Sequence, residues 1–99
     1  MSSVVIEIRD IAIQDVFISE DTLTIDLSDG RSISTPLAWY PRLWHGTEAE
    51  RLHWRLIGKG AGIHWPDLDE DISLEGLILG KASNESQASL TRWLAQRSS

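Results

Sequence analysis

The sequence predicts an α+β fold: a small antiparallel β-sheet, built from two successive hairpins and a further strand, with short helices and a C-terminal amphipathic helix. Three observations predict this class. Apolar and polar residues alternate over residues 22–27, which is the pattern of a half-buried strand. Helix-capping patterns stand at residues 47–50 and at Ser73. An apolar stripe with helical spacing follows residue 83.

The first hairpin is predicted within residues 14–27. A two-residue Glu-Asp turn in its middle places Ile18 opposite Leu23 and Val16 opposite Ile25, so that the apolar faces of both strands coincide. Glu-Asp is a poor sequence for such a turn. The prediction therefore depends on the register of the apolar residues and not on turn chemistry.

The second hairpin turns around Gly30. A two-residue turn there would mix the apolar and polar faces of the two strands. A three-residue loop with Gly30 in the left-handed conformation instead places Ile25 opposite Ile33. We therefore predict the longer loop and a third strand over residues 31–35, which Pro36 ends.

Two short helices are predicted next. Pro41 can begin a helical turn, which Gly46 ends. Thr47 and Glu50 have the spacing of a capping box, so a second helix is expected to run to about His53.

A further strand pair is predicted around the glycine-rich loop 58–62. Pairing Leu56 with Ile63, and Trp54 with Trp65, keeps one face apolar. Together with the preceding strand and helix, this strand makes a β-helix-β crossing.

An acidic turn over residues 67–71 is predicted to lead into a helix that Ser73 caps and Gly80 ends. Three apolar residues share one face of this helix: Leu74, Leu77 and Ile78.

The last helix is predicted to begin at a second capping box, formed by Asn84 and Gln87. It carries an apolar stripe of Leu90, Trp93 and Leu94 on an otherwise polar surface. This stripe can pack on the chain's own sheet or on another chain.

We expect one α+β domain over residues 1–80, followed by a linker and a helix over residues 81–99. Apolar, β-branched residues 4–8 are expected to form an edge strand or an extended arm. Five tryptophans in 99 residues are many, and we expect them to supply much of the core.

Charge and composition limit the function. The formal net charge is −6 and the nine Lys and Arg residues form no basic run, which disfavours direct nucleic-acid binding and favours a basic protein partner. The chain has no cysteine, so disulfides, thiolate metal sites and cysteine nucleophiles are excluded. No apolar stretch is long enough to span a membrane, and the first residues do not have a secretory pattern. We therefore expect a cytoplasmic location.

Three patterns suggest chemistry, and each has a simpler structural explanation. The loop 58–62 resembles a phosphate loop but leads into a strand, so we interpret it as a hairpin connection. His64 and four nearby acids can hold a hard cation or perform acid–base chemistry. The acids can equally form a solvated acidic turn. They are Asp67, Asp69, Glu70 and Asp71. The histidines stand in three different elements without zinc-site spacing: His45, His53 and His64. We therefore assign no catalytic, cofactor or metal residue and expect no cofactor.

Partner-binding candidates come from two clusters. Aromatic residues gather around Pro41, and such residues are enriched at binding hot spots. The apolar stripe of the last helix is the second cluster. The candidate residues are Trp39, Tyr40, Trp44, Leu90, Trp93 and Leu94.

Three segments, residues 29–43, 54–58 and 62–77, carry uncommon tryptophan and proline positions in order. With them the sequence resembles the bacterial domain-of-unknown-function family DUF2442 over about residues 14–80. The resemblance implies a compact α+β domain and supplies no catalytic residues. It also implies a partner in small two-gene, toxin–antitoxin-like arrangements. Some relatives continue into a helix-turn-helix DNA-binding domain, for which one helix after residue 80 is too short.

The expected function is therefore a non-catalytic protein-binding or regulatory module, such as an antitoxin-like partner. Its partner would be the product of a neighbouring gene, or a second copy of the chain. One alternative is a nucleic-acid-linked regulator that acts through convergent basic residues: Arg42, Arg51, Arg55 and Lys59. The other is a metal-dependent enzyme that uses His64 and the acidic turn.

Overall fold

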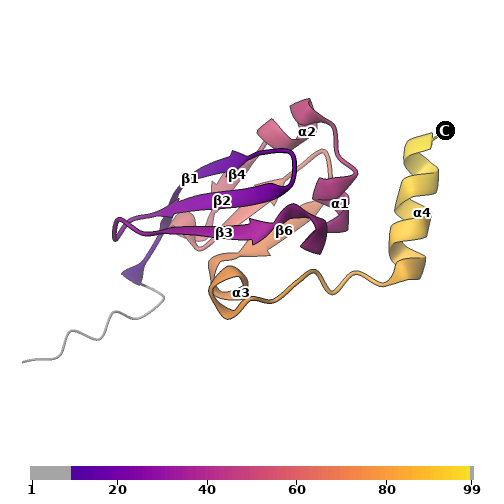
Figure 1. Ribbon diagram of the computed structural model, residues 1–99. Coiled ribbons are helices and arrows are strands. Elements are labelled where there is room, and N and C mark those ends of the chain that lie inside the picture. Colours follow the sequence, from indigo (N-terminus) through magenta and orange to yellow (C-terminus); the bar gives the residue numbers. More distant parts are fainter. Residues whose placement is uncertain (1–9, 99) are drawn as a thin grey trace, which may run out of the picture.

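The computed structural model describes residues 10–98, with helices and strands arranged as in Figure 1. The strands are β1 (Ile13–Ile18), β2 (Thr22–Leu27), β3 (Ser32–Pro36), β4 (Arg55–Ile57), β5 (Gly62–Trp65) and β6 (Glu70–Ser73). The helices are α1 (Pro41–Trp44), α2 (Glu48–Leu52), α3 (Leu74–Leu79) and α4 (Gln87–Ser98), with 3₁₀ turns η2 (Leu37–Trp39) and η3 (Gly58–Gly60). The predicted α+β class is confirmed.

The strands form two three-stranded antiparallel sheets, in the orders β1-β2-β3 and β4-β5-β6. The prediction placed them in one sheet. The connection through α1 and α2 therefore leads from the first sheet to the second and is not a crossing within one sheet. In Figure 1 the first sheet lies in front of the second, and buried side chains from both contribute to one core.

The register of the first hairpin is confirmed. Ile18 pairs with Leu23 and Val16 pairs with Ile25, as the coincidence of apolar faces predicts. The backbone N–H of Ser19 donates to the carbonyl of Thr22 at 2.9 Å, which closes the tight Glu-Asp turn. Core burial therefore sets this register despite unfavourable turn residues.

The second hairpin also has the predicted loop. Ile25 pairs with Ile33 and Leu23 pairs with Thr35. Gly30 has φ +92°, the left-handed conformation that the three-residue loop requires.

The acidic turn is shorter than predicted, because Glu70 and Asp71 belong to β6. Asp71 pairs with His64, and Glu70 pairs with Trp65. Asp69 has φ +49°, which lets the chain reverse just before β6. In β6 only Ile72 points into the core, so three polar neighbours conceal the strand pattern in the sequence.

The helix caps were predicted at all but one position. Thr47 and Glu50 form the capping box of α2, and Ser73 caps α3 through the backbone N–H of Gly76. The predicted box at Asn84 is wrong, since the hydroxyl of Ser86 accepts the backbone N–H of Ser89 and so caps α4.

The core is mostly aliphatic, and the expectation that tryptophans would supply much of it is wrong. Trp65 alone among the five is fully buried. Trp54 and Trp93 are partly buried against the core, while Trp39 and Trp44 are exposed. Branched side chains from the strands fill the space between the sheets instead. The residues 4–8 of the proposed edge strand lie outside the described part of the chain.

Gly60 allows the second sheet to approach the first. A Cβ atom there would lie 2.7 Å from Cβ of Ala12 and 3.0 Å from the carbonyl oxygen of Ile13, and Gly60 has φ +89°. Both the space and the backbone conformation therefore require glycine at this position.

We expect Gly60→Ala to lower the free energy of unfolding by about 1–3 kcal/mol, because it adds a steric clash to an unfavourable φ. Gly30→Ala is the matched control. Gly30 has a similar φ but no atom within 4 Å of the added carbon, so it should lose only about 1 kcal/mol from backbone strain. Urea denaturation of both variants measures the difference. Equal losses would show that the Gly60 contact does not constrain the two sheets.

Candidate functional site

The acidic residues on which the metal-dependent alternative depends do not converge. The Asp67 carboxylate is hydrogen-bonded to Nδ1 of His53 at 2.6 Å, and the Asp71 carboxylate is hydrogen-bonded to Nδ1 of His64 at 2.5 Å, between the paired strands β6 and β5. Asp69 instead faces Arg42, with an N–O distance of 3.7 Å. Within residues 10–98 no group of three His, Asp or Glu side chains has the geometry to hold a metal ion. These acids form separate pairs, so the geometry gives no support to the metal-dependent alternative.

The basic residues of the nucleic-acid alternative do not form a common free face either. Arg42 donates to the Glu85 carboxylate and to the carbonyls of Leu68 and Asp69. Arg51 donates to the carbonyl of Leu43 and, through Nη2, to that of the next residue. Two of the four side chains are therefore engaged within the domain, and only Arg55 and Lys59 are left as exposed positions.

The glycine-rich loop 58–62 serves the packing of the sheets. It forms the 3₁₀ turn η3, buries Gly60 and leads into β5. A phosphate site needs a row of free N–H groups at a helix N-terminus. The loop is followed by a strand, in agreement with the hairpin interpretation.

The aromatic candidates separate into exposed and buried residues. Trp39 is 39 % exposed and Trp44 is 45 % exposed. Tyr40 is only 4 % exposed, and its hydroxyl donates to the carbonyl of Lys81 at 3.2 Å. Tyr40 is thus a core residue that fixes the start of the C-terminal linker, and it offers no surface to a partner.

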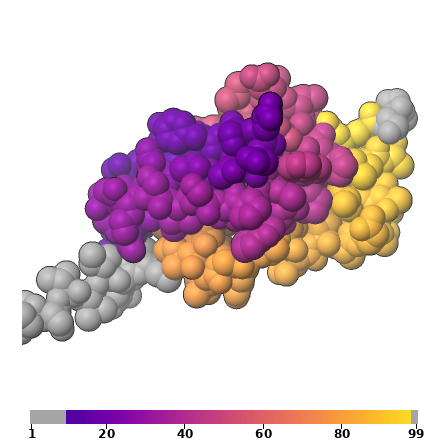
Figure 2. Space-filling model, viewed as in Figure 1, coloured from indigo at the N-terminus to yellow at the C-terminus, as the bar shows by residue number. Residues whose placement is uncertain are grey.

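The C-terminal stripe lies against the chain's own domain. Leu90, Trp93 and Leu94 are each partly buried, and Trp93 packs against the core. The guanidinium groups of Arg42 and Arg97 lie 5.1 Å and 4.6 Å from the ring centre of Trp93, which are cation–π distances. Figure 2 shows α4, in yellow, in contact with the surface of the preceding helices.

A second anchor joins the end of α4 to α2. Arg97 donates to both carboxylate oxygens of Glu50, at 2.9 Å and 2.6 Å. Hydrogen bonds from Arg97, and next from the backbone N–H of Thr47, lower the pKa of the Glu50 carboxyl to about 2. This carboxylate stays ionised at neutral pH, so the anchor is retained there.

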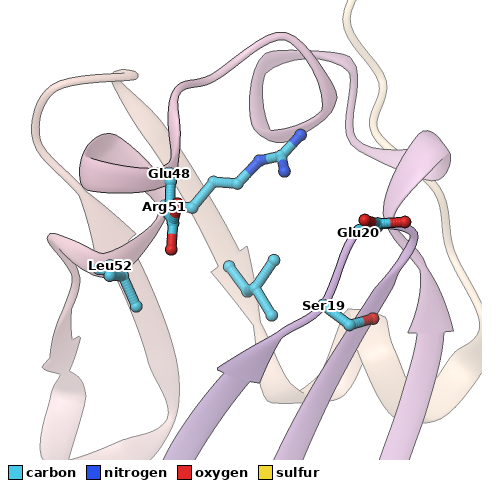
Figure 3. Close-up of a pocket in the computed structure, with 6 residues that line it drawn as sticks. Ser19, Glu20, Glu48, Arg51 and Leu52 are labelled. Atoms are coloured by element: carbon cyan, nitrogen blue, oxygen red, sulfur yellow. The ribbon is translucent and has the colours of Figure 1, made fainter.

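A groove of about 330 Å³ runs between α2 and the β1–β2 turn (Figure 3). Glu48 and Leu52 of α2 line one side, and Ser19 and Glu20 of the turn line the other. Ile18 and Arg51 also line it. The groove therefore combines apolar side chains with two exposed carboxylates and one arginine.

The groove did not follow from the sequence. Leu52 is 66 % exposed, the most exposed large apolar residue described, and α2 has no buried residue at all. The available signal was a leucine at the end of a short helix whose apolar neighbour one turn earlier is only the small Ala49.

A second depression of about 450 Å³ adjoins the same turn. Asp21, Pro36 and the exposed Trp44 are among its lining residues. The Glu-Asp turn thus contributes to two hollows, each with an exposed apolar side chain. We call this surface, formed by Ile18, Glu20, Asp21, Trp44, Glu48 and Leu52, the acidic end.

A sequence profile of DUF2442, described as "Protein of unknown function", matches residues 13–83. The chain belongs to the DUF2442 family. The match contains all six strands and the helices α1 to α3, and it confirms the resemblance found in the sequence. Helix α4 lies beyond the matched part of this DUF2442 protein.

Two solved structures have the same fold. A crystal structure of a protein of unknown function from Rhodospirillum rubrum ATCC 11170 has a TM-score of 0.65 and 24 % identity, covering 81 % of this chain and 96 % of that one. An NMR structure of the uncharacterised protein CV0863 from Chromobacterium violaceum has a TM-score of 0.63 and 20 % identity, covering 87 % and 75 %. No curated protein matches the chain. No helix among residues 10–98 is both long and apolar enough to cross a membrane.

The exposure of Leu52 can be tested against a buried neighbour. We expect Leu52→Ala to change the free energy of unfolding by less than about 0.5 kcal/mol, because the side chain already faces solvent. Leu43→Ala is the matched control, since Leu43 of α1 is fully buried and should cost about 2–5 kcal/mol. Denaturant unfolding of both variants gives the values. A loss above 1.5 kcal/mol for Leu52→Ala would mean that this leucine serves the core and not a surface.

Proposed function

We propose that this DUF2442 protein is a non-catalytic binding module of the cytoplasm, and that it holds a basic protein partner as antitoxin-like or regulatory proteins do. The acidic end carries the proposal. It combines exposed apolar side chains, which provide binding energy when desolvated, with carboxylates that select a positively charged partner.

Exposure supports this choice of surface. Leu52 and Trp44 are 66 % and 45 % exposed, so each would bury substantial apolar area under a partner. Large exposed apolar side chains beside a groove are typical of interaction sites.

Charge also supports a basic partner. Glu20, Asp21 and Glu48 are exposed, and none has a cation within ion-pair distance among the described contacts. Arg51 also lines the groove, and its guanidinium is engaged by the backbone carbonyls of Leu43 and Trp44 in α1 and by no carboxylate of the acidic end among the described contacts. The acidic end therefore adds local negative charge to a chain whose net charge is −6.

We expect co-expression with the neighbouring gene product to give a stable complex, and Glu20→Lys/Glu48→Lys to weaken that complex at least tenfold. Lysines there would place like charges against a basic partner, which costs several kcal/mol. Co-purification detects the complex, and calorimetry measures its affinity. The matched control is Glu75→Lys, an exposed acid on α3, which should bind like the unmodified chain.

Two results would contradict the proposal. Separate elution of the two proteins would show that the neighbouring gene product is not the partner. If the Glu20→Lys/Glu48→Lys variant bound the partner with the same affinity as the Glu75→Lys variant, the acidic end would not be the binding surface.

A further inference from the structure

The C-terminal arm, residues 81–98, is held on the domain mainly by polar contacts. The backbone N–H of Ser83 donates to the carbonyl of Trp39 at 3.0 Å. Arg42 then binds Glu85 in the linker, and Arg97 binds Glu50 at the far end of α4. The apolar residues of α4 are only partly buried, so these polar contacts add to the packing of Trp93 in holding the arm closed.

The linker of the arm and Glu70 line the same groove. A groove of about 320 Å³ is lined by Glu70 and Tyr40 of the domain and by residues 81–84 of the linker. Figure 1 shows the linker running past the second sheet from α3 to α4. Burial raises the pKa of the Glu70 carboxyl to about 7, and the nearby carboxylates of Glu85 and Asp71 add to this rise. The backbone N–H of Asp71 and the charge of Arg42 act in the opposite direction.

The charged groups around Glu70 come from four parts of the chain. Arg42 of α1, Asp71 of β6 and Glu85 of the linker act on its charge. Lys81 lines the same groove, and the hydroxyl of Tyr40 is already bound to the carbonyl of Lys81. Asp71 is paired with His64 on the neighbouring strand.

The guanidinium of Arg42, which favours an ionised Glu70, is already engaged by the arm. Its Nε and Nη2 both donate to the Glu85 carboxylate, at distances from 2.7 to 3.0 Å. Its Nη1 donates to the carbonyls of Leu68 and Asp69. A negative charge on Glu70 therefore repels Glu85 and competes for the same guanidinium.

We propose that the C-terminal arm is a pH-dependent latch, in which ionisation of Glu70 loosens the linker and α4 and presents the stripe of Leu90, Trp93 and Leu94. When the linker moves away, water reaches Glu70 and favours its charged form. The latch is a property of the chain alone and does not depend on the proposed function of the acidic end.

The direction of the effect follows from linkage. Burial and the Glu85 carboxylate of the closed arm both raise the pKa of Glu70 above its ordinary value of 4.5, so the closed form binds the Glu70 proton more tightly than an open form without Glu85 nearby. Closure is most stable while Glu70 is protonated, and it loses stability as the pH rises from 4.5 to about 7. If opening restores the ordinary pKa, the equilibrium constant for opening should rise roughly 30-fold between pH 5.5 and pH 8.5.

Hydrogen exchange of the full chain tests the latch. After correction for intrinsic exchange rates, amides of α4 should lose protection roughly 30-fold from pH 5.5 to pH 8.5, while amides of β2 and β5 should not. Glu70→Gln keeps the neutral form at all pH values and should abolish this loss. The matched control is Glu75→Gln, an exposed acid on α3, which should retain it. Equal protection of α4 at both pH values, or the same pH dependence in Glu70→Gln, would overturn the proposal.

A reciprocal measurement does not alter Glu70 at all. Arg97→Ala removes the anchor to Glu50 at the other end of α4 and should open the arm. Because coupling between two sites is reciprocal, the pKa of Glu70 should then fall from about 7 toward 4.5, as measured by NMR titration of its side-chain carboxyl. An unchanged pKa in Arg97→Ala, together with increased exchange of α4, would show that Glu70 and the arm are not coupled.

Discussion

The indole of Trp65 is the contact on which the arrangement of the surface depends. It lies fully buried in β5, the central strand of the second sheet, and its Nε1 donates to the carbonyl of Arg51 at 3.0 Å. Arg51 in turn donates to the carbonyls of Leu43 and Trp44. A side chain inside the core thus places α2, and α2 places the end of α1. This series of hydrogen bonds therefore positions α1 and α2, the two helices that contribute to the acidic end.

Charge is divided unevenly along the chain, and this division explains how the arm docks. Helix α4 carries Arg92 and Arg97 and no acidic residue, so all 15 acidic residues lie elsewhere. Opposite charges therefore draw α4 to the domain, where two guanidinium groups lie at cation–π distance from Trp93. The attraction is electrostatic and partly exposed to solvent, so its strength depends on salt and on the protonation of nearby carboxyls.

The sequence predicted those parts of the fold in which a local pattern and core burial agree. Ile18 opposite Leu23, and Ile25 opposite Ile33, followed from the requirement that apolar faces coincide. The caps of α2 and α3 followed from the hydrogen-bonding side chains of Thr47, Glu50 and Ser73. Strand β6 did not, because Ile72 is its one core residue and charged neighbours suggested a turn.

The candidate site was harder to predict, because exposure is set by tertiary contacts. Composition alone did not reveal that the aliphatic residues of two sheets would fill the core and leave Trp39 and Trp44 outside. The groove beside Leu52 depends on where α2 lies, and the distance between α2 and the β1–β2 turn cannot be read from the sequence.

Glu50 connects this groove with the C-terminal arm. Its carboxylate accepts the backbone N–H of Thr47, which caps α2, and also binds Arg97 of α4. Since α2 buries none of its own residues, it depends on these contacts for its position. Opening of the arm therefore removes a partner from the carboxylate that caps one wall of the groove, so the two surfaces share a structural element through which each can influence the other.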